Sequence, residues 1–552
     1  MKDRLRQQIG DALQACFDNN TLHSGVVPEV QVEVPGNPEH GDFASNLAMN
    51  MARAEKKSPR QIAEALVEAL GNCESLSKVE IAGPGFINFT LTPTCWYEVL
   101  DDITAKGEKY GTSQVGQGRK VQVEFVSANP TGPLHIGHGR GAAVGDAVAA
   151  ILQAVGFDVQ REYYVNDAGN QVATLGRSIW MRLREQNGET LVFPEDGYQG
   201  KYIRDLAAQL REEDRSIAEL DECEAVKRCT AFGISKVLDW IAADLKNFGI
   251  TFDNWFSEQS LFDRNMVEVE LGKLAAKGLS YEQGGALWLR TTDYGDDKDR
   301  VLIKSDGSPT YFASDVAYHM EKFDRGFDRV IDVWGADHHG YVQRMKAVVA
   351  GLGHSSDDLE VLLIQMVNLL RDGQPYTMGK RSGNFITLRE VVDEVGSDAC
   401  RFYFLMRRSD SQLDFDLELA KRQSSDNPVY YVQYAHARVC SIKRNAEEQG
   451  IVLPKHGTVD LSSLVLPEEL LLAKTLARYP ETVGGAAQNC EPHRIVYYLQ
   501  EIAGQFHSYY NRQRVLVEDS ATTQARLYLI DGVRTVLANA LNLLGVDAPE
   551  RM

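Results

Sequence analysis

The spacing of apolar residues changes twice along the chain and divides it into three stretches. In residues 1–112 the pattern predicts an initial helix, a turn at residues 40–42, and helices that begin at Phe43 and Pro59. A strand pair is predicted around Val79–Phe89, where apolar and polar residues alternate. The first stretch is therefore predicted to be a small α+β domain.

The middle stretch, residues 113–427, alternates predicted strands and helices after a polar, glycine-rich linker at 107–120. The apolar run Val121–Val126 predicts a strand, and the helix that follows carries one continuous apolar stripe. The stripe comprises Val144, Ala147, Val148, Ile151, Leu152 and Val155. This alternation favours a Rossmann-like α/β domain, with helices on both faces of a parallel sheet. A charged, mostly helical segment at about 182–284 is predicted to be an insertion.

The last stretch, residues 428–552, has a helical pattern throughout. Tyrosines recur in it, at Tyr430, Tyr431, Tyr434, Tyr497, Tyr498, Tyr509 and Tyr510. The three patterns predict a multidomain protein in which an α/β parallel-sheet domain lies between an α+β N-terminal domain and an all-α C-terminal domain.

The chain has 552 residues and a formal net charge of −20, which on bulk charge alone disfavours a nucleic-acid partner. Basic side chains nevertheless gather locally, at Arg371, Lys380, Arg381, Arg389, Arg401, Arg407 and Arg408. The eight cysteines include no CxxC pair, so we expect no structural zinc and a reducing, cytoplasmic environment. The charged N-terminus does not fit a secretory signal, and no apolar run reaches the length of a membrane span.

Candidate chemistry concentrates at Ala128–His138, where the predicted strand turns into a helix. The unpaired N–H groups of a helix N-terminus suit a phosphate. His135 and His138 are three residues apart and can face one ligand, while Gly137 lets a flat ring approach the backbone. The Gly-x-Gly-x-x-Ala spacing from Gly137 also imitates a dinucleotide fingerprint, so a nicotinamide-dependent oxidoreductase remains an alternative.

The stretch Ser127–Arg140 resembles the first signature of class I aminoacyl-tRNA synthetases, and specifically that of the arginyl-tRNA synthetase family. Gly41–Asn46 and Ile81–Asn88 resemble the additional N-terminal domain of that family, and the last stretch resembles its helical anticodon-binding domain. The resemblance covers essentially the whole chain. It implies an enzyme that ligates L-arginine to its tRNA with ATP, through arginyl-adenylate, and that needs bound tRNA before it activates arginine.

Thr377–Asn384 resembles the second signature of class I synthetases, with Lys380 at a family lysine and Thr377 where the family has its first lysine. An ammonium on a flexible stem neutralises the triphosphate while the α-phosphorus is attacked and pyrophosphate leaves. A basic surface turn is the alternative for this segment taken alone. The resemblance implies that His135, His138 and Lys380 are catalytic. It implies ATP contacts from Gly137, His135, His138, Asp337, Lys380, Arg381 and Ser382.

An arginine substrate requires a fixed carboxylate, because its guanidinium is a planar, permanently charged fork of donors. Glu124 and Asp315 occupy positions where the family has such acids. Tyr311 precedes Asp315 by four residues, so on a helix the two side chains would lie on the same face. Without the resemblance, Glu124 could be a strand-edge acid and Asp315 an acid near a helix N-terminus. The arginine contacts that the resemblance implies are Glu124, Ser127, Asn129, His138, Tyr311, Asp315 and His338.

A third cluster, Trp334–Gly340, follows the predicted strand Val330–Val333 and so lies at the carboxyl end of the sheet, where α/β proteins bind ligands. The resemblance implies that Asp337 and His338 line the adenosine and arginine pocket. Adjacent histidines beside an acid also suggest a metal site, but neighbouring side chains converge poorly, so we expect no metal ligands here.

Contacts with tRNA are expected where cations and aromatic residues are interleaved in the last stretch, although many of its tyrosines must belong to the core. The candidates are Arg438, Lys443, Arg444, Tyr509, Arg512 and Arg514. The expected partners are the tRNA for arginine, L-arginine, and ATP with Mg²⁺, with no membrane and a monomeric enzyme. A synthetase-like RNA-binding protein without catalysis is a second alternative, which the two histidines and Lys380 disfavour.

Overall fold

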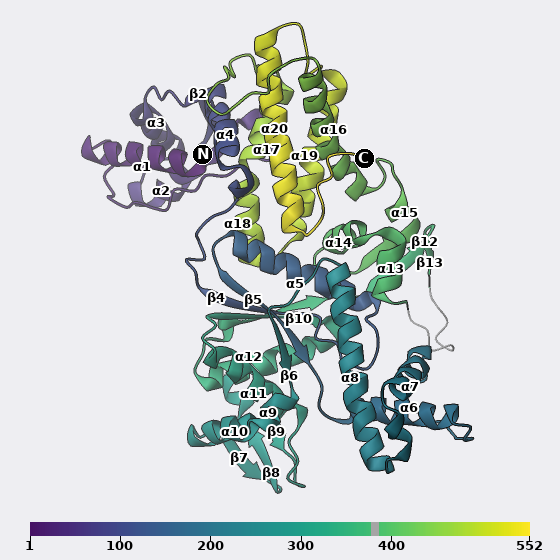
Figure 1. Ribbon diagram of the computed structural model, residues 1–552. Coiled ribbons are helices and arrows are strands. Elements are labelled where there is room, and N and C mark those ends of the chain that lie inside the picture. The colour runs from purple at the N-terminus through teal and green to yellow at the C-terminus, as the bar shows by residue number, and fades with distance from the viewer. Residues whose placement is uncertain (377–385) are drawn as a thin grey trace. The chain divides into compact units, whose positions relative to one another are not determined.

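A computed structural model describes residues 1–376 and 386–552 of the chain (Figure 1). These residues form two compact units, and each unit is built from segments that are distant in sequence. The first unit comprises Met1–Tyr110, Val439–Tyr479 and Gly504–Val536. The second comprises Gly111–Arg438, Pro480–Ala503 and Leu537–Met552.

The N-terminal part of the first unit is an α+β fold, as predicted. Its elements are α1 (Lys2–Asp18), β1 (Phe43–Ser45), α2 (Leu47–Glu55), α3 (Pro59–Leu70), β2 (Leu76–Ala82), β3 (Phe86–Leu91) and α4 (Pro93–Lys106). The predicted strand pair is confirmed as the antiparallel partners β2 and β3. The prediction of a helix from Phe43 is wrong, because β1 pairs with β3 and the helix starts only at Leu47.

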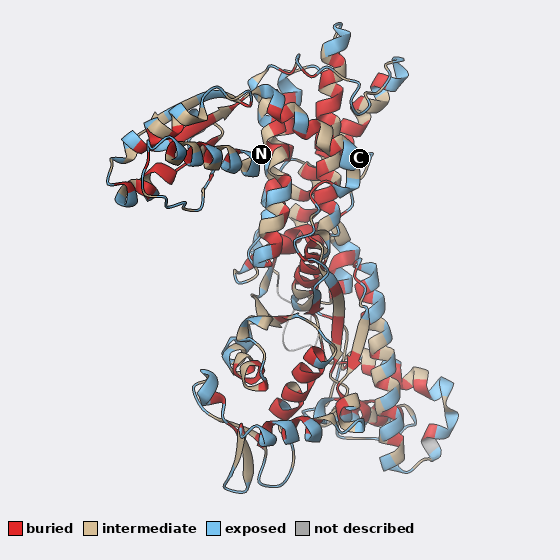
Figure 2. Ribbon diagram, turned by 90° about the vertical axis from the view of Figure 1, so that its left-hand side faces the viewer, coloured by how far each residue is buried: buried red, intermediate tan, exposed pale blue. Residues whose placement is uncertain are grey.

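One-sided burial accounts for the helices of this part, and Figure 2 shows buried and exposed residues alternating along them. In α1, Leu5, Ile9, Leu13 and Cys16 recur at helical spacing and are buried. In α3, a capping box between Ser58 and Gln61 satisfies backbone donors at the first turn. Buried Ile62 and Leu66 of the same helix show that, in α3, local capping and one-sided burial specify the same helix.

The second unit is organised around a five-stranded parallel sheet with the order β11-β10-β4-β5-β6, which confirms the predicted sheet. Its strands are β4 (Lys120–Glu124), β5 (Asp158–Val165), β6 (Asn254–Ser257), β10 (Arg329–Gly335) and β11 (Leu359–Ile364). The strands that follow β4 in the chain lie on both sides of it, with β5 and β6 on one side and β10 and β11 on the other. The boundary between β4 and β10 is therefore a topological switch point, where sheets of this kind bind ligands at the carboxyl ends of their strands.

Helices cover both faces of this sheet. On one face lies α5 (Ile136–Ala154), whose Gly145 packs directly against the Phe125 side chain, and the predicted apolar stripe of α5 is buried. On the other face lies α11 (Tyr311–Asp324), whose Tyr318 and Lys322 bond to acidic residues of the strands. The alternation of side chains along a strand thus separates an apolar face from a charged one.

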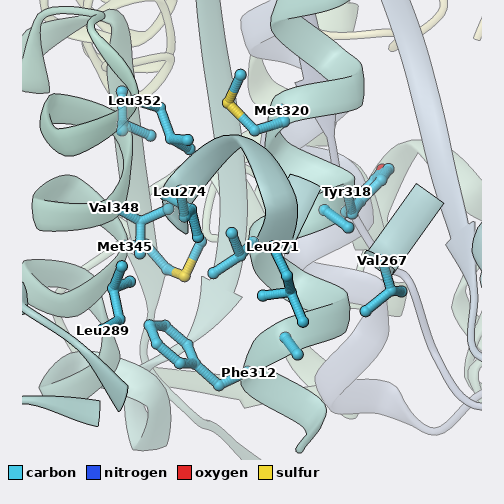
Figure 3. Close-up of a cluster of buried hydrophobic side chains, with 14 of the residues drawn as sticks. Val267, Leu271, Leu274, Leu289, Phe312, Tyr318, Met320, Met345, Val348 and Leu352 are labelled. Atoms are coloured by element: carbon cyan, nitrogen blue, oxygen red, sulfur yellow. The ribbon is translucent and has the colours of Figure 1, made fainter. Parts of the chain in front are cut away.

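A compact apolar core packs around α11 (Figure 3). It includes Leu271 and Leu274 of α10 (Met266–Ala276), Phe312 and Met320 of α11, and Val348 of α12 (Val342–Leu352). These buried contacts position α11 and, with it, the charged groups that it presents to the strands.

The segment of the chain that connects β5 to β6 contains three helices that pack together as a separate layer (Figure 1). They are α6 (Asn170–Gln186), α7 (Lys201–Glu213) and α8 (Glu222–Asn247). The prediction of an insertion at 182–284 is corrected at both ends. The helical layer begins at α6, and β6 returns to the parallel sheet inside the predicted range. The short strand β6 lies within a charged, helix-rich context, which concealed it.

Two small sheets complete the second unit. The strands β7 (Ser280–Gln283), β8 (Ala286–Leu289) and β9 (Arg300–Ile303) are antiparallel. The other sheet has the order β13-β12-β14, from β12 (Val367–Arg371), β13 (Gln374–Pro375) and β14 (Leu413–Asp416). Short helices α9 (Gln259–Asp263), α13 (Leu388–Val395), α14 (Ser397–Leu405) and α15 (Leu417–Lys421) connect these elements.

The C-terminal stretch is helical, as predicted. Its helices are α16 (Pro428–Glu448), α17 (Pro467–Ala477), α18 (Tyr479–Asn489), α19 (His493–Arg512) and α20 (Ser520–Leu543), and their residues are shared between the two units. Among the residues that the structure describes, no helix is both long enough and apolar enough to cross a membrane.

Candidate active site

The loop between β4 and α5 brings the first signature to the switch point of the sheet. His135 is the N-cap of α5, and its Nδ1 accepts a hydrogen bond from the Gly137 N–H at 3.1 Å. His138 closes a reciprocal capping box, because its Nδ1 accepts from the His135 N–H at 3.3 Å. A Cβ at residue 137 would lie 2.9 Å from the His135 ring, so any larger residue there would displace that ring.

The same geometry fixes the protonation of the two imidazoles. Their rings stack with centroids 3.7 Å apart, and desolvation lowers the pKa of both, that of His138 to about 3. Because each Nδ1 accepts from the backbone, the neutral ring carries its hydrogen on Nε2. His135 and His138 are therefore neutral donors of hydrogen bonds, and the arrangement offers phosphate oxygens N–H groups rather than imidazolium charges.

Glu124, at the end of β4, belongs to a buried cluster of four ionisable side chains. Lys322 of α11 lies 2.5 Å from Glu124 and 2.8 Å from Asp332 of β10, and its side chain is fully buried. His319 lies 2.9 Å from Asp332 through Nε2 and 2.8 Å from the backbone oxygen of Asp315 through Nδ1. His319 therefore links the Asp332 carboxylate to the backbone of α11.

In this cluster the Lys322 ammonium lies between two carboxylates, and His319 bonds to one of them. Burial alone would lower the pKa of Lys322, but the charges of Asp332 and Glu124 raise it above its ordinary value. Burial would raise the pKa of Asp332, yet Lys322 and His319 hold it at about 2. Ser127 completes the network by donating to Glu124 at 2.9 Å. Glu124 thus has its own cation before any substrate arrives.

Asp315 and Glu258 are in a different electrostatic situation. Asp315 accepts a hydrogen bond from the Tyr341 hydroxyl, and Glu258 is bonded by the hydroxyls of Tyr164 and Ser314. Burial raises the pKa of Asp315; for Glu258, burial and the charge of Asp315 raise it to about 7. Among the described residues, neither carboxylate has a Lys or Arg side chain within ion-pair distance. A cationic ligand would supply the missing charge.

The other predicted arginine contacts lie around this pair of acids. Tyr311 is the first residue of α11 and its side chain is 69% exposed, whereas Asp315 one turn later is partly buried. The two lie on one helix, as predicted. Asn129, in the loop after β4, is bonded to Gln171 at 2.7 Å. The structure thus gathers Glu124, Ser127 and Asp315 around α11.

The cluster after β10 is exposed. Asp337 and His338 lie in a 3₁₀ turn, Ala336–Tyr341, with their side chains 82% and 63% exposed and 3.6 Å apart. The turn is at the carboxyl end of β10, where the sequence predicts it. Among the described residues, no three His, Cys, Asp or Glu side chains are arranged to hold a metal ion.

Some predicted residues cannot be placed at the site. Lys380, Arg381 and Ser382 lie outside the described residues, with the rest of the second signature. Of the candidates for tRNA contact, Tyr509 is corrected, because its ring is fully buried and its hydroxyl bonds to Glu469.

The remaining tRNA candidates are cations at or near the surface. Lys443 bonds to Asp531 at 2.5 Å, and Arg438 lies over the Tyr434 ring. Arg444 is partly buried, while Arg514 is exposed. The side chain of Arg512 is 66% exposed and lies 3.7 Å from Glu468. Arg512 and Arg514 therefore remain the strongest candidates.

Five further residues of the site were not predicted from the sequence: Lys322, His319, Asp332, Glu258 and Tyr341. A signal was present for part of this set, since Asp315, His319 and Lys322 follow one another at helical spacing and must share a face of α11. Glu258 follows β6, which the sequence did not reveal as a strand. Its approach to Asp315 depends on long-range pairing of β5 with β6.

Three family models of known proteins match consecutive parts of the chain. Residues 3–91 match the family model of the arginyl tRNA synthetase N terminal domain, residues 99–410 that of the class I (R) tRNA synthetase catalytic domain, and residues 432–552 that of the DALR anticodon binding domain. An arginine–tRNA ligase from Syntrophotalea carbinolica is 65% identical and one from Citrifermentans bemidjiense is 58% identical, both over the full length of either chain. The solved arginyl-tRNA synthetase of Thermus thermophilus, 23% identical, has a similar fold, with a TM-score of 0.76 over the full length of both chains.

Proposed function

The chain belongs to the arginyl-tRNA synthetase family, and from this premise we propose which of its residues perform each part of the reaction. The enzyme ligates arginine to tRNA through an adenylate, as a class I synthetase. The arginine carboxylate attacks the α-phosphorus of ATP, and pyrophosphate leaves. A hydroxyl of the terminal adenosine of the tRNA then attacks the arginyl carbonyl of the adenylate, and AMP leaves. Both steps depend on positioning and charge stabilisation and need no protein nucleophile.

Arginine recognition is assigned to Asp315 and Glu258. The observation that carries this assignment is the contrast between them and Glu124, whose charge Lys322 already compensates. Two carboxylates that have no Lys or Arg partner among the described residues match a guanidinium, which has five donors and a permanent charge. Glu124, Ser127, Asn129, Tyr311 and His338 are proposed to contact the remainder of the amino acid.

ATP is assigned to the N-terminus of α5. The Nε2–H groups of His135 and His138 are proposed to bond phosphate oxygens, with Gly137 leaving room for the nucleotide. Asp337, Arg381 and Ser382 complete the proposed ATP contacts. Mg²⁺ is proposed to accompany ATP, since phosphate oxygens are the hard ligands it prefers. We propose no structural zinc, a monomeric enzyme and a cytoplasmic location.

The domain assignment follows the same premise. Residues 1–112 are proposed as the tRNA-contacting N-terminal domain, 113–427 as the catalytic domain and 428–552 as the anticodon-binding domain.

Pyrophosphate exchange tests the proposed reaction directly. Exchange into ATP is expected with arginine and matching tRNA, and it is expected to be negligible with lysine or citrulline in place of arginine. Omission of the tRNA is expected to abolish exchange. Equal exchange with lysine would contradict the proposed recognition of a guanidinium, whereas exchange without tRNA would contradict only the tRNA requirement.

Lys380→Ala is expected to slow adenylate formation by roughly 10²–10³, which is typical when one group that stabilises developing charge is removed. The dissociation constant for arginine should change little, because the ammonium acts as pyrophosphate forms. Rapid-quench single turnovers with saturating substrates measure this rate. Lys273→Ala, which removes an exposed lysine on α10, serves as the control. A normal single-turnover rate in Lys380→Ala would contradict the assignment.

Arginine binding is expected to tighten as the pH rises through about 7. Burial and Asp315 raise the pKa of Glu258, so below that pH its carboxyl is protonated and offers the guanidinium no charge. Bound arginine favours the ionised form, so binding releases a proton. Calorimetric titration of arginine between pH 6 and 8, in buffers of different ionisation enthalpy, measures both effects, and Glu258→Gln should remove them. A pH-independent affinity in the unmodified enzyme would reject this role of Glu258.

The double variant Arg512→Ala/Arg514→Ala is expected to weaken tRNA binding. The slope of log affinity against log salt concentration should fall by about one unit for each phosphate group that the variant no longer binds. Lys273→Ala is again a control, because Glu270 and Asp324 already pair with this lysine. Filter binding over a range of salt concentrations measures the slope. An unchanged slope would remove both arginines from the proposed tRNA surface.

A further inference from the structure

The loop that leaves β4 is strained. Val126 has φ 69° and Ser127 has φ 40°, both in the left-handed region, and a β-branched residue such as valine rarely occupies it. Such residues persist only where their surroundings impose the conformation. The next residues of this loop, Ala128–Gly132, lead to His135 and His138, which are proposed to bond the phosphates of ATP.

Three contacts hold Ala128–Gly132 in place. The buried Tyr163 of β5 donates its hydroxyl to the Ala128 backbone oxygen at 2.8 Å. Tyr202 of α7 donates its hydroxyl to the Thr131 backbone oxygen, also at 2.8 Å. The Asn129 amide donates to the Gln171 side chain of α6 at 2.7 Å.

Two of the three contacts come from the helical layer rather than from the sheet. The α6–α8 layer has its own packing, with α6 against both α7 and α8. Tyr202 also limits the loop sterically, since a Cβ at Gly132 would lie 3.1 Å from its hydroxyl oxygen and 3.2 Å from its ring. The layer therefore shapes a loop that lies 71 residues earlier in the sequence, at the switch point of the sheet.

We propose that the α6–α8 layer positions the substrate loop, with Gln171 orienting the Asn129 amide toward arginine and Tyr202 fixing the turn that leads to His135. Gln171 and Tyr202 are positioning residues and touch neither substrate. This inference rests on the roles proposed above for Asn129 and His135. It predicts different kinetic effects for the two residues, because one acts through an arginine contact and the other through the ATP loop.

The test compares single substitutions in the full-length enzyme by tRNA-dependent pyrophosphate exchange. Gln171→Leu is expected to raise the KM for arginine roughly tenfold, the size of one missing hydrogen bond, with little change in the KM for ATP. Gln171→Glu keeps an acceptor oxygen and is expected to retain most of the arginine affinity. Tyr202→Phe is expected to lower kcat by roughly tenfold, while Tyr198→Phe, four residues earlier in the chain, should match the unmodified enzyme.

The outcomes separate this inference from the assignments on which it rests. If Asn129→Ala raises the KM for arginine but Gln171→Leu does not, positioning through Gln171 is overturned while the role of Asn129 stands. If Asn129→Ala itself has no effect, that role fails together with the Gln171 part of the inference. Tyr202→Phe acting like Tyr198→Phe overturns the Tyr202 part. A fall in the unfolding midpoint that accounts for the reduced activity of Tyr202→Phe would do so as well.

Discussion

Asp315→Asn is expected to lower kcat/KM for arginine by roughly 10²–10⁴. The substituted site would lose the charged pair between Asp315 and the guanidinium and leave Glu258 as the remaining proposed carboxylate partner. Breaking a buried pair typically costs about 3–5 kcal/mol, at about 1.4 kcal/mol for each factor of ten. The KM for ATP should change far less, because Asp315 bonds to Tyr341, whereas ATP is assigned to the histidines at the N-terminus of α5. Steady-state pyrophosphate exchange with each substrate varied in turn measures the two effects separately.

A matched control and a neutral ligand make the Asp315 test specific. Asp324→Asn removes an exposed acid at the end of the same helix, where it pairs with Lys273, and is expected to leave both KM values unchanged. Citrulline has nearly the shape of arginine without its charge. The ratio of arginine to citrulline affinity should therefore fall in Asp315→Asn, while equal losses for arginine and ATP would assign Asp315 a structural role.

The sequence predicted the parts of the fold that local patterns determine. The apolar stripe of α5, with Val144, Val148 and Ile151 at helical spacing, is buried as predicted. The apolar run before the first signature likewise located β4. The start of α2 and the position of β6 depended instead on partners distant in sequence, since Phe43 pairs with Phe89 and Tyr164 with Phe256. Such pairings leave no local periodicity over so few residues.

The candidate site was predictable in its motifs and not in its charge balance. The first signature identified His135 and His138, but their capping geometry and neutral state emerged only from the folded α5 terminus. Glu124 and Asp315 were indistinguishable in the sequence, because nothing local indicates which buried acid already has a cation. That distinction depends on Lys322, which lies 198 positions after Glu124 in the chain.

Lys322 therefore affects both stability and specificity. It compensates Glu124 and Asp332, and this leaves Asp315 and Glu258 as the acids that require a cation from the substrate. A buried network of this kind restricts the site to one arrangement of charges, because any unpaired member would be costly. In the proposed site, arginine completes the arrangement by supplying its own cation.

Lys322→Met is accordingly expected to destabilise the enzyme by about 3–5 kcal/mol, because it leaves the buried carboxylates of Glu124 and Asp332 without the ammonium that compensates them. The thermal unfolding midpoint, followed by circular dichroism, should fall clearly below that of the unmodified enzyme. Adding Glu124→Gln to Lys322→Met is expected to recover part of this loss, since the double variant removes one of the two carboxylates that Lys322 compensates. Lys227→Met removes an exposed lysine of α8 and is expected to cost at most about 1 kcal/mol. A midpoint for Lys322→Met no lower than that for Lys227→Met would show that the buried cluster does not depend on its ammonium.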